Sequence, residues 1–251
     1  MDVHAHTHTQ RKKWTHYLWE FLMLFLAVFC GFLAENFREH LIDHRKEKDF
    51  VNSLLEDLKK DTARLNYGIR RLKGDITYTD SLVILYVKGN KENNYQIRMS
   101  RYGQAAGHSV DIVFNDRTSS QLKGTGSMRL IRKKALADSI AQYWNNQIKI
   151  AQIHDRFETF RVEQRKIGWE TFGWYRALTD KADSIRIDNN QFGLSFKQLT
   201  RINNEQILSE FMNVTATLYD TAIWQFLPEL ETEFSLANNL ILLIKKEYHL
   251  N

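Results

Sequence analysis

Two carboxylates one helical turn apart are the residues of this chain whose spacing best suits chemistry. Asp57 and Asp61 are four positions apart, so an α-helix places them on one face, as a pair for proton transfer or for a metal ion would be. Lys60 and Arg64 interleave with them, which is typical of a charged, solvated helix surface. We therefore expect a solvated surface at these positions, not a catalytic pair.

Other side chains with chemical potential have equally ordinary interpretations. His4, His6 and His8 could bind zinc, nickel or copper, but their alternation in a polar tail gives no fixed geometry. The sequence contains no HExxH, CxxC, nucleophile-elbow or dinucleotide motif, and GTGSM at residues 124–128 lacks the lysine of a phosphate loop. We predict no catalytic residue, no metal site and no cofactor.

An apolar segment near the start of the chain predicts a membrane span. Residues 21–34 read FLMLFLAVFCGFLA without a charge, and residues 17–37 give 21 residues, about 31 Å of helix at ~1.5 Å per residue. A cleaved signal peptide is the alternative, but cleavage after Ala34 would put Phe32 where a small residue is required. A lipoprotein signal is disfavoured because Phe29 precedes the only cysteine.

The predicted domains are residues 1–16 as a cytoplasmic His-rich and basic tail, residues 17–37 as the span, and residues 38–251 as an extracytoplasmic helical domain. This orientation rests on the short basic tail, since a domain of this length can be translocated whatever its charge. Glu20 lies at the edge of the span, where an ionisable group suggests contact with another membrane subunit. It could instead reach the membrane surface.

Composition and periodicity predict a mainly α fold. Only 1 of 251 residues is proline and 11 are glycine, which suits long helices and not a sandwich or barrel. Apolar residues recur at alternating spacings of four and three along residues 51–72, 136–157 and 230–248. We expect an elongated antiparallel helical bundle continuous with the span. Alternation in residues 95–99 and 110–114 allows one small β-hairpin.

Further start signals mark the last helices. Asn203 is the expected N-cap, with Gln206 completing a capping box and Ile202 and Ile207 packing as a staple. Pro228 is expected either to kink this helix or to open a new one.

Charge and aromatic residues point to two possible surfaces. The 35 basic and 30 acidic residues are interleaved, which disfavours nucleic-acid binding. A basic cluster at Arg129, Arg132, Lys133 and Lys134 could bind an anionic partner or lipid head group, although a solvated helix start is expected. The aromatic group consists of Trp169, Phe172, Trp174 and Tyr175; it is either core at a bundle turn or an exposed patch for a partner or apolar ligand.

Two stretches resemble a known family. They are the anchor with Glu20 and Gly31 followed by Phe50, Leu54, Asp57, Leu58, Asp61 and Leu65, and the segment LKGTGSMRLIRKKALADSIAQY at residues 122–143. The chain resembles an uncharacterised Bacteroidota family of single-span membrane proteins, a domain of unknown function. The chain departs from the family pattern at Trp19, where a glycine is expected. The resemblance implies a bacterial inner-membrane protein with its domain in the periplasm, and it implies no functional residue.

These features predict a non-enzymatic, membrane-anchored helical protein for protein–protein interaction. It would act as a homo-oligomer or as an accessory subunit of an envelope complex. The alternative is an extracytoplasmic ligand-sensing bundle that signals through a membrane partner, because the short N-terminal tail cannot be an output domain. An enzyme is the third possibility.

Overall fold

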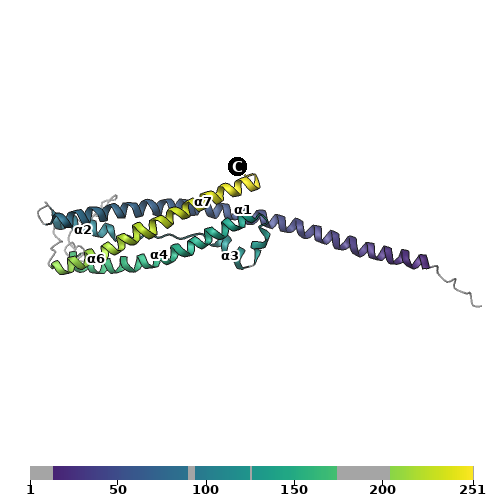
Figure 1. Ribbon diagram of the computed structural model, residues 1–251, viewed down its shortest axis with the longest axis horizontal. Coiled ribbons are helices and arrows are strands. Elements are labelled where there is room, and N and C mark those ends of the chain that lie inside the picture. Colours follow the sequence, from purple (N-terminus) through teal and green to yellow (C-terminus); the bar gives the residue numbers. More distant parts are fainter. Residues whose placement is uncertain (1–13, 90–93, 125, 174–203, 251) are drawn as a thin grey trace, which may run out of the picture. The chain divides into compact units, whose positions relative to one another are not determined.

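The computed structural model describes residues 14–89, 94–124, 126–173 and 204–250, and their regular structure is entirely helical (Figure 1). The elements, in chain order, are α1 (Trp14–Lys88), α2 (Tyr95–Ala106), α3 (Arg117–Gly124), the 3₁₀ helix η1 (Ser127–Leu130), α4 (Lys134–Phe172), α6 (Glu205–Thr221), the π-helical turn η3 (Ala222–Phe226) and α7 (Leu227–Tyr248). The prediction of a mainly α fold is confirmed.

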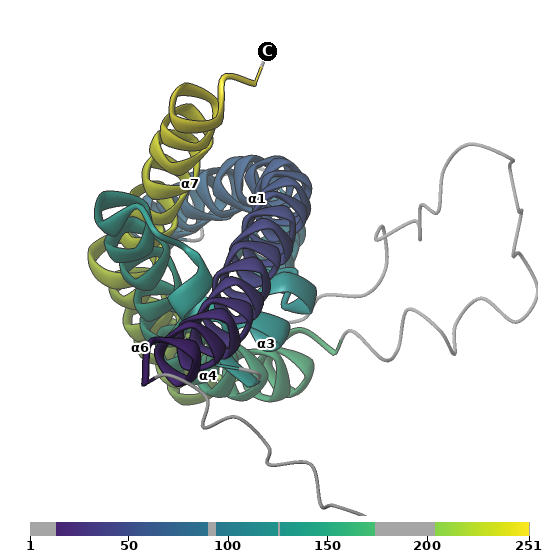
Figure 2. The same cartoon turned by 90° about the vertical axis from the view of Figure 1, so that its right-hand side faces the viewer.

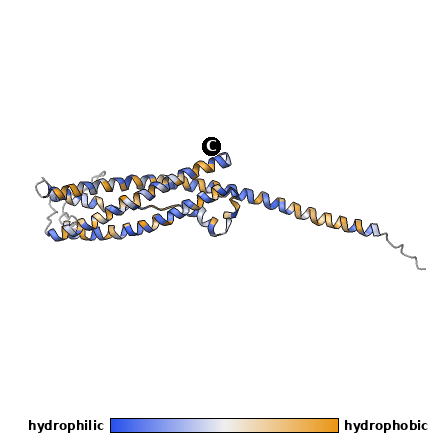
Figure 3. Cartoon of the chain, viewed as in Figure 1, coloured by the Kyte–Doolittle hydropathy of each residue, from blue (hydrophilic) through white to orange (hydrophobic). Residues whose placement is uncertain are grey.

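The first of two compact units, Met1–Val51, contains the apolar stretch of α1. Its large apolar side chains are exposed in the structure, including Phe21, Leu24, Phe32 and Phe37. In Figure 3 this stretch is the orange part of the segment of α1 that Figure 1 draws in purple. By length and composition this is the one described helix that could cross a membrane, a property that it shares with N-terminal signal sequences.

The second unit, Asn52–Asn251, is a helical bundle in which α4 packs along α6 and α7 (Figure 2). Leu82 of α1, Phe172 of α4 and Leu208 of α6 share one core cluster, whereas Lys133 before α4 pairs with Glu247 of α7 at the opposite end. The chain therefore passes along α4 in the same direction as along α1. It returns in the opposite direction through α6, η3 and α7.

Two apolar clusters form the core of the second unit. The central cluster contains Leu65, Ile69, Leu72, Val110, Ile150, Ile153, Phe157, Leu218, Ala222, Phe226 and Leu230. The far cluster, at the Lys88 end of α1, contains Leu82, Leu85, Tyr95, Met99, Ile167, Phe172, Leu208, Phe211 and Met212. The apolar seams predicted for residues 51–72 and 136–157 are buried, as their periodicity requires.

The hairpin expected from the alternation in residues 95–114 is wrong, because no strand forms in the described residues. One face of α2 is buried, and it includes Tyr95, Met99, Gly103 and Ala106. These residues are spaced by four and three positions, so the helical periodicity of the segment determines its structure and the alternation does not. The chain then continues as an extended strap, residues 108–116, without a strand partner.

The strap runs beside α1 in the opposite direction. It contacts α1 first at Asp75, where the His108 Nδ1 atom lies 3.4 Å from Oδ1, and last at Asp61, which accepts a hydrogen bond from Asn115. Gly68 permits the close approach between these points, since a Cβ atom there would lie 2.2 Å from Ile112 Cδ1. The strap is the connection that allows α4 to run parallel to α1.

The start of α6 lies one residue later than predicted. Asn204 is the N-cap, and its side chain accepts a 2.9 Å hydrogen bond from the Gln206 amide. Asn203 and Ile202 lie outside the described residues. Pro228 is the second residue of α7, two positions after the π-helical turn η3, and a proline N–H is not needed in the first turn of a helix.

Candidate functional site

The strongest site candidate is a layer of polar side chains buried between α1, α4, α7 and the strap. Asp61 is its centre and is 1% exposed. Its Oδ1 accepts hydrogen bonds from the backbone and side-chain nitrogens of Asn115, at 2.9 and 2.8 Å, and its Oδ2 accepts one from the Tyr143 hydroxyl at 2.9 Å. Burial raises the pKa of Asp61, an effect that these donors and Arg64 oppose. Burial and the nearby Asp61 raise the pKa of Tyr143.

Glu233 of α7 completes this polar layer and is fully buried. Its Oε2 accepts a 3.1 Å hydrogen bond from the Asn146 amide, whereas Oε1 and the Gln147 Nε2 have no hydrogen-bond partner among the described residues. Burial is the main cause that raises the pKa of Glu233 to about 8, and Asp61 adds to the rise. The layer therefore holds two coupled carboxyl groups, and Glu233 is predominantly protonated at neutral pH.

The polar layer was not predicted, and it contradicts the solvated surface expected for Asp57 and Asp61. Asp57 is also buried, and it accepts hydrogen bonds from the Thr118 hydroxyl at 2.6 Å and from Arg117 at 3.3 Å. Both carboxylates bind long-range partners, which spacing along one helix does not reveal. Through these hydrogen bonds Asp61 holds the strap and Asp57 holds α3.

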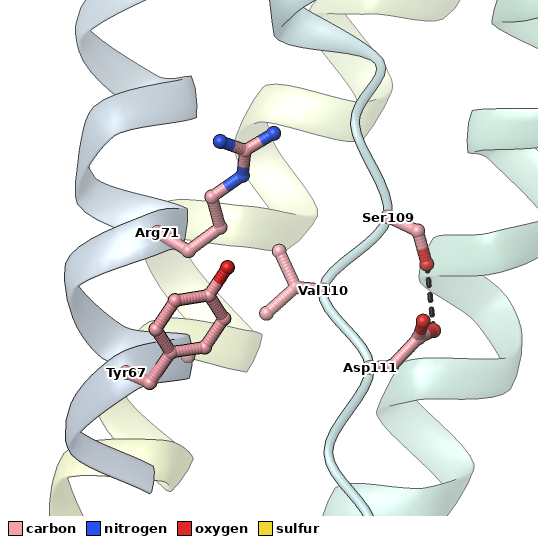
Figure 4. Close-up of a pocket in the computed structure, with 6 residues that line it drawn as sticks. Tyr67, Arg71, Ser109, Val110 and Asp111 are labelled. Carbon is pink, nitrogen blue, oxygen red and sulfur yellow. Dashed lines mark hydrogen bonds between the residues drawn. The ribbon is translucent and has the colours of Figure 1, made fainter. Parts of the chain in front are cut away.

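A half-open pocket of about 250 Å³ lies between α1 and the strap (Figure 4). Tyr67 and Arg71 of α1 and Val110 of the strap line it. Ser109 and Asp111 also line it and are joined by a 2.7 Å hydrogen bond. Its polar groups include one guanidinium and one carboxylate. The pocket has no convergent set of ionisable groups like that of the polar layer.

The predicted interaction residues do not form one exposed group. Phe172 is buried, with its ring 5.0 Å from that of Phe211 in an edge-on contact, whereas the Trp169 side chain is 53% exposed. Trp174 and Tyr175 lie outside the described residues, as do His4, His6 and His8. Glu20 is exposed on α1 and lies 3.0 Å from the His16 ring.

An apolar set at the Lys88 end of α1 was missed. Val83, Ile84 and Val87 are 41, 55 and 79% exposed, although their spacing resembles that of a buried seam. Trp169 is at this same end of the second unit, because Ile167 and Phe172 share the far cluster with Leu82 and Leu85. We call Val83, Ile84, Val87 and Trp169 the far-end apolar set. Elsewhere, Trp224 in η3 is 77% exposed.

Within the described residues, no group of three or more histidine, cysteine, aspartate or glutamate side chains could hold a metal ion. Comparisons of the chain with protein-family models, curated proteins and solved structures find no match.

Proposed function

We propose that this chain is a non-enzymatic, single-span envelope protein whose helical domain binds another protein. Residues 1–16 would lie in the cytoplasm of a bacterium and residues 38–251 in the periplasm. The orientation is supported by the basic start of the chain, and the periplasmic location by the family resemblance. The partner would be a second copy or another subunit of an envelope complex.

The far-end apolar set is the observation that carries this proposal. Val83, Ile84 and Val87 share one face of α1, and exposed apolar side chains gathered at one end of a bundle are typical of interaction surfaces. Trp169 adds an aromatic side chain of the kind that dominates binding energy in interfaces. The buried faces of the same helices are already occupied by the far cluster.

The polar layer supports the alternative, a sensing bundle. Asp61 and Glu233 lie on different helices and have raised pKa values, so a change in their protonation would alter how α1 and α7 pack. This function also requires a membrane partner for its output.

A pull-down of the full-length, C-terminally tagged protein in mild detergent, with mass spectrometry and particle mass, tests the proposal. The V87E/W169A variant is expected to lose a stoichiometric partner or its self-association. The L242E/W224A variant is the matched control, because Leu242 and Trp224 are 66 and 77% exposed and lie outside the far-end apolar set. A monomer without a partner, or equal behaviour of the two variants, would contradict the proposal.

A further inference from the structure

The net positive charge of the chain arises in one short segment. Residues 117–134 contain six basic and no acidic residues, namely Arg117, Lys123, Arg129, Arg132, Lys133 and Lys134. The other residues hold 35 − 6 = 29 basic groups against 30 acidic ones, a net charge of −1. The segment therefore carries more than the whole net charge of +5, although its helices also bury Thr118, Leu122 and Leu130 in the bundle.

Arg117 and Lys133 attach this segment to the bundle. Arg117 pairs with Asp57 and Glu56, at 3.3 and 3.6 Å, and Lys133 pairs with Glu247 at 2.7 Å. Four basic residues of the segment are exposed, and we call them the basic surface: Lys123, Arg129, Arg132 and Lys134. The Lys123 amine lies 4.6 Å from the Trp144 ring centroid, an arrangement that leaves its charge in place.

The basic surface lies at the end of the second unit where α1 enters it. The Asp57 contacts with Arg117 and Thr118 fix α3 beside the first turns of α1 after Asn52. In Figure 1, α3 lies at the same end of this unit as the C-terminus of α7. Residues 38–51 separate Asn52 from the predicted span, and 14 residues reach at most about 50 Å even when fully extended. The length of this connection therefore limits how far from the membrane the basic surface can lie.

We propose that the basic surface binds the anionic lipid head groups of the membrane in which the chain is anchored. Each lysine or arginine close to an anionic bilayer improves binding roughly fivefold, and the effect is confined to about one Debye length. Such contact would hold the second unit against the bilayer and orient its far-end apolar set away from it. The inference depends on the membrane anchor in the proposed function but not on the protein partner.

The test uses full-length protein with Cys30→Ala and Ser127→Cys, reconstituted into vesicles that carry a head-group quencher. A dye on position 127, in η1, reports how close the basic surface lies to the bilayer. Quenching is expected to be stronger in vesicles of phosphatidylcholine with phosphatidylglycerol than in phosphatidylcholine alone, and to weaken in about 1 M salt, where the Debye length is about 3 Å. Co-flotation with neutral vesicles tests the anchor separately.

The R129E/K134E variant is expected to reduce quenching in the anionic vesicles to the neutral-vesicle level. R70E/K166E is the matched control, because it changes the net charge equally at two exposed positions of α1 and α4 outside the basic surface. Equal quenching in the two vesicle types, or an equal loss in both variants, would overturn the proposal. So would binding of an acidic soluble protein without any quenching by the anionic bilayer, since the surface would then serve a protein ligand.

Discussion

The Tyr143 hydroxyl of α4 donates a 2.9 Å hydrogen bond to Asp61 Oδ2 of α1, and both side chains are almost completely buried. The same carboxylate holds Asn115, so one residue connects the first long helix, the strap and the second long helix. Glu233 adds α7 to this polar layer. Burial of these polar groups costs desolvation energy, which the hydrogen bonds of Asp61 offset in part.

Loss of the tyrosine hydroxyl tests the importance of this contact. Tyr143→Phe is expected to lower the free energy of unfolding by about 1–3 kcal/mol, because a buried carboxylate loses a hydrogen-bond donor. Tyr67→Phe, at a 64% exposed position of the same unit, is the control and should have little effect. Urea unfolding of the full-length protein in detergent, followed by circular dichroism, measures both. Equal stability of the two variants would show that the contact contributes nothing.

The stability of the second unit should fall as pH rises from about 4.5 to about 8. Glu233 has a raised pKa of about 8 in the folded protein against a reference value of 4.5, so in this window the folded state binds more protons than the unfolded state. The contribution of Glu233 to the free energy of unfolding is fully present below the pKa of the unfolded state. It is lost as pH rises through the pKa of the folded state. The raised pKa of Asp61 acts in the same direction.

Glu233→Gln is expected to flatten this pH profile and to raise the urea midpoint above neutral pH, since an amide keeps the shape without ionising. Glu163→Gln, on the exposed side of α4, is the control and should retain the profile of the unaltered chain. Urea midpoints of the two variants and of the unaltered chain, measured from pH 4.5 to 9, test this expectation. An unchanged slope in the Glu233 variant would contradict the role given to this residue.

Two glycines of α1 should respond oppositely to the same substitution. Gly74→Ala is expected to stabilise the protein by up to about 1 kcal/mol, because alanine favours helix and a Cβ there meets nothing within 4 Å. Gly68→Ala should lose this gain or destabilise, because its Cβ would lie 2.2 Å from Ile112 Cδ1 of the strap. Hydrogen exchange of strap amides should increase only in the Gly68 variant. A similar gain in stability for both variants would show that Ile112 of the strap can move away from residue 68 without destabilising the protein.

The proposed orientation can be tested with the single native cysteine removed. In a Cys30→Ala background, Thr232→Cys is expected to react with a membrane-impermeant maleimide in cells whose outer membrane has been permeabilised. Thr7→Cys should react only after the inner membrane is opened. The reverse pattern would place the helical domain in the cytoplasm, and reaction of both would indicate that residues 17–37 do not anchor the chain in the membrane.

Local rules predicted much of the helical structure. The buried sides of residues 51–72 and 136–157 follow from spacings of three and four, which any α-helix converts into one face. The C-terminal seam was placed less accurately: Leu230, Ala237 and Ile244 are buried as predicted, but Glu233 and Leu240 complete the buried face instead of Phe234 and Ile241. The sequence prediction assigned only apolar residues to the buried face. It therefore left out Glu233 and missed the polar layer.

The amino-acid sequence by itself determined the long helices, where one helix is apolar enough to cross a membrane, and which segment gives the chain its net positive charge. These are properties of neighbouring residues and of composition. Only the tertiary structure decided that Asp57 and Asp61 are buried, that Glu233 joins Asp61 in one polar layer, and that Phe172 is core while Val87 is exposed. Burial and pKa depend on partners more than fifty positions away, such as Asn115 and Tyr143 for Asp61, and no local pattern encodes them.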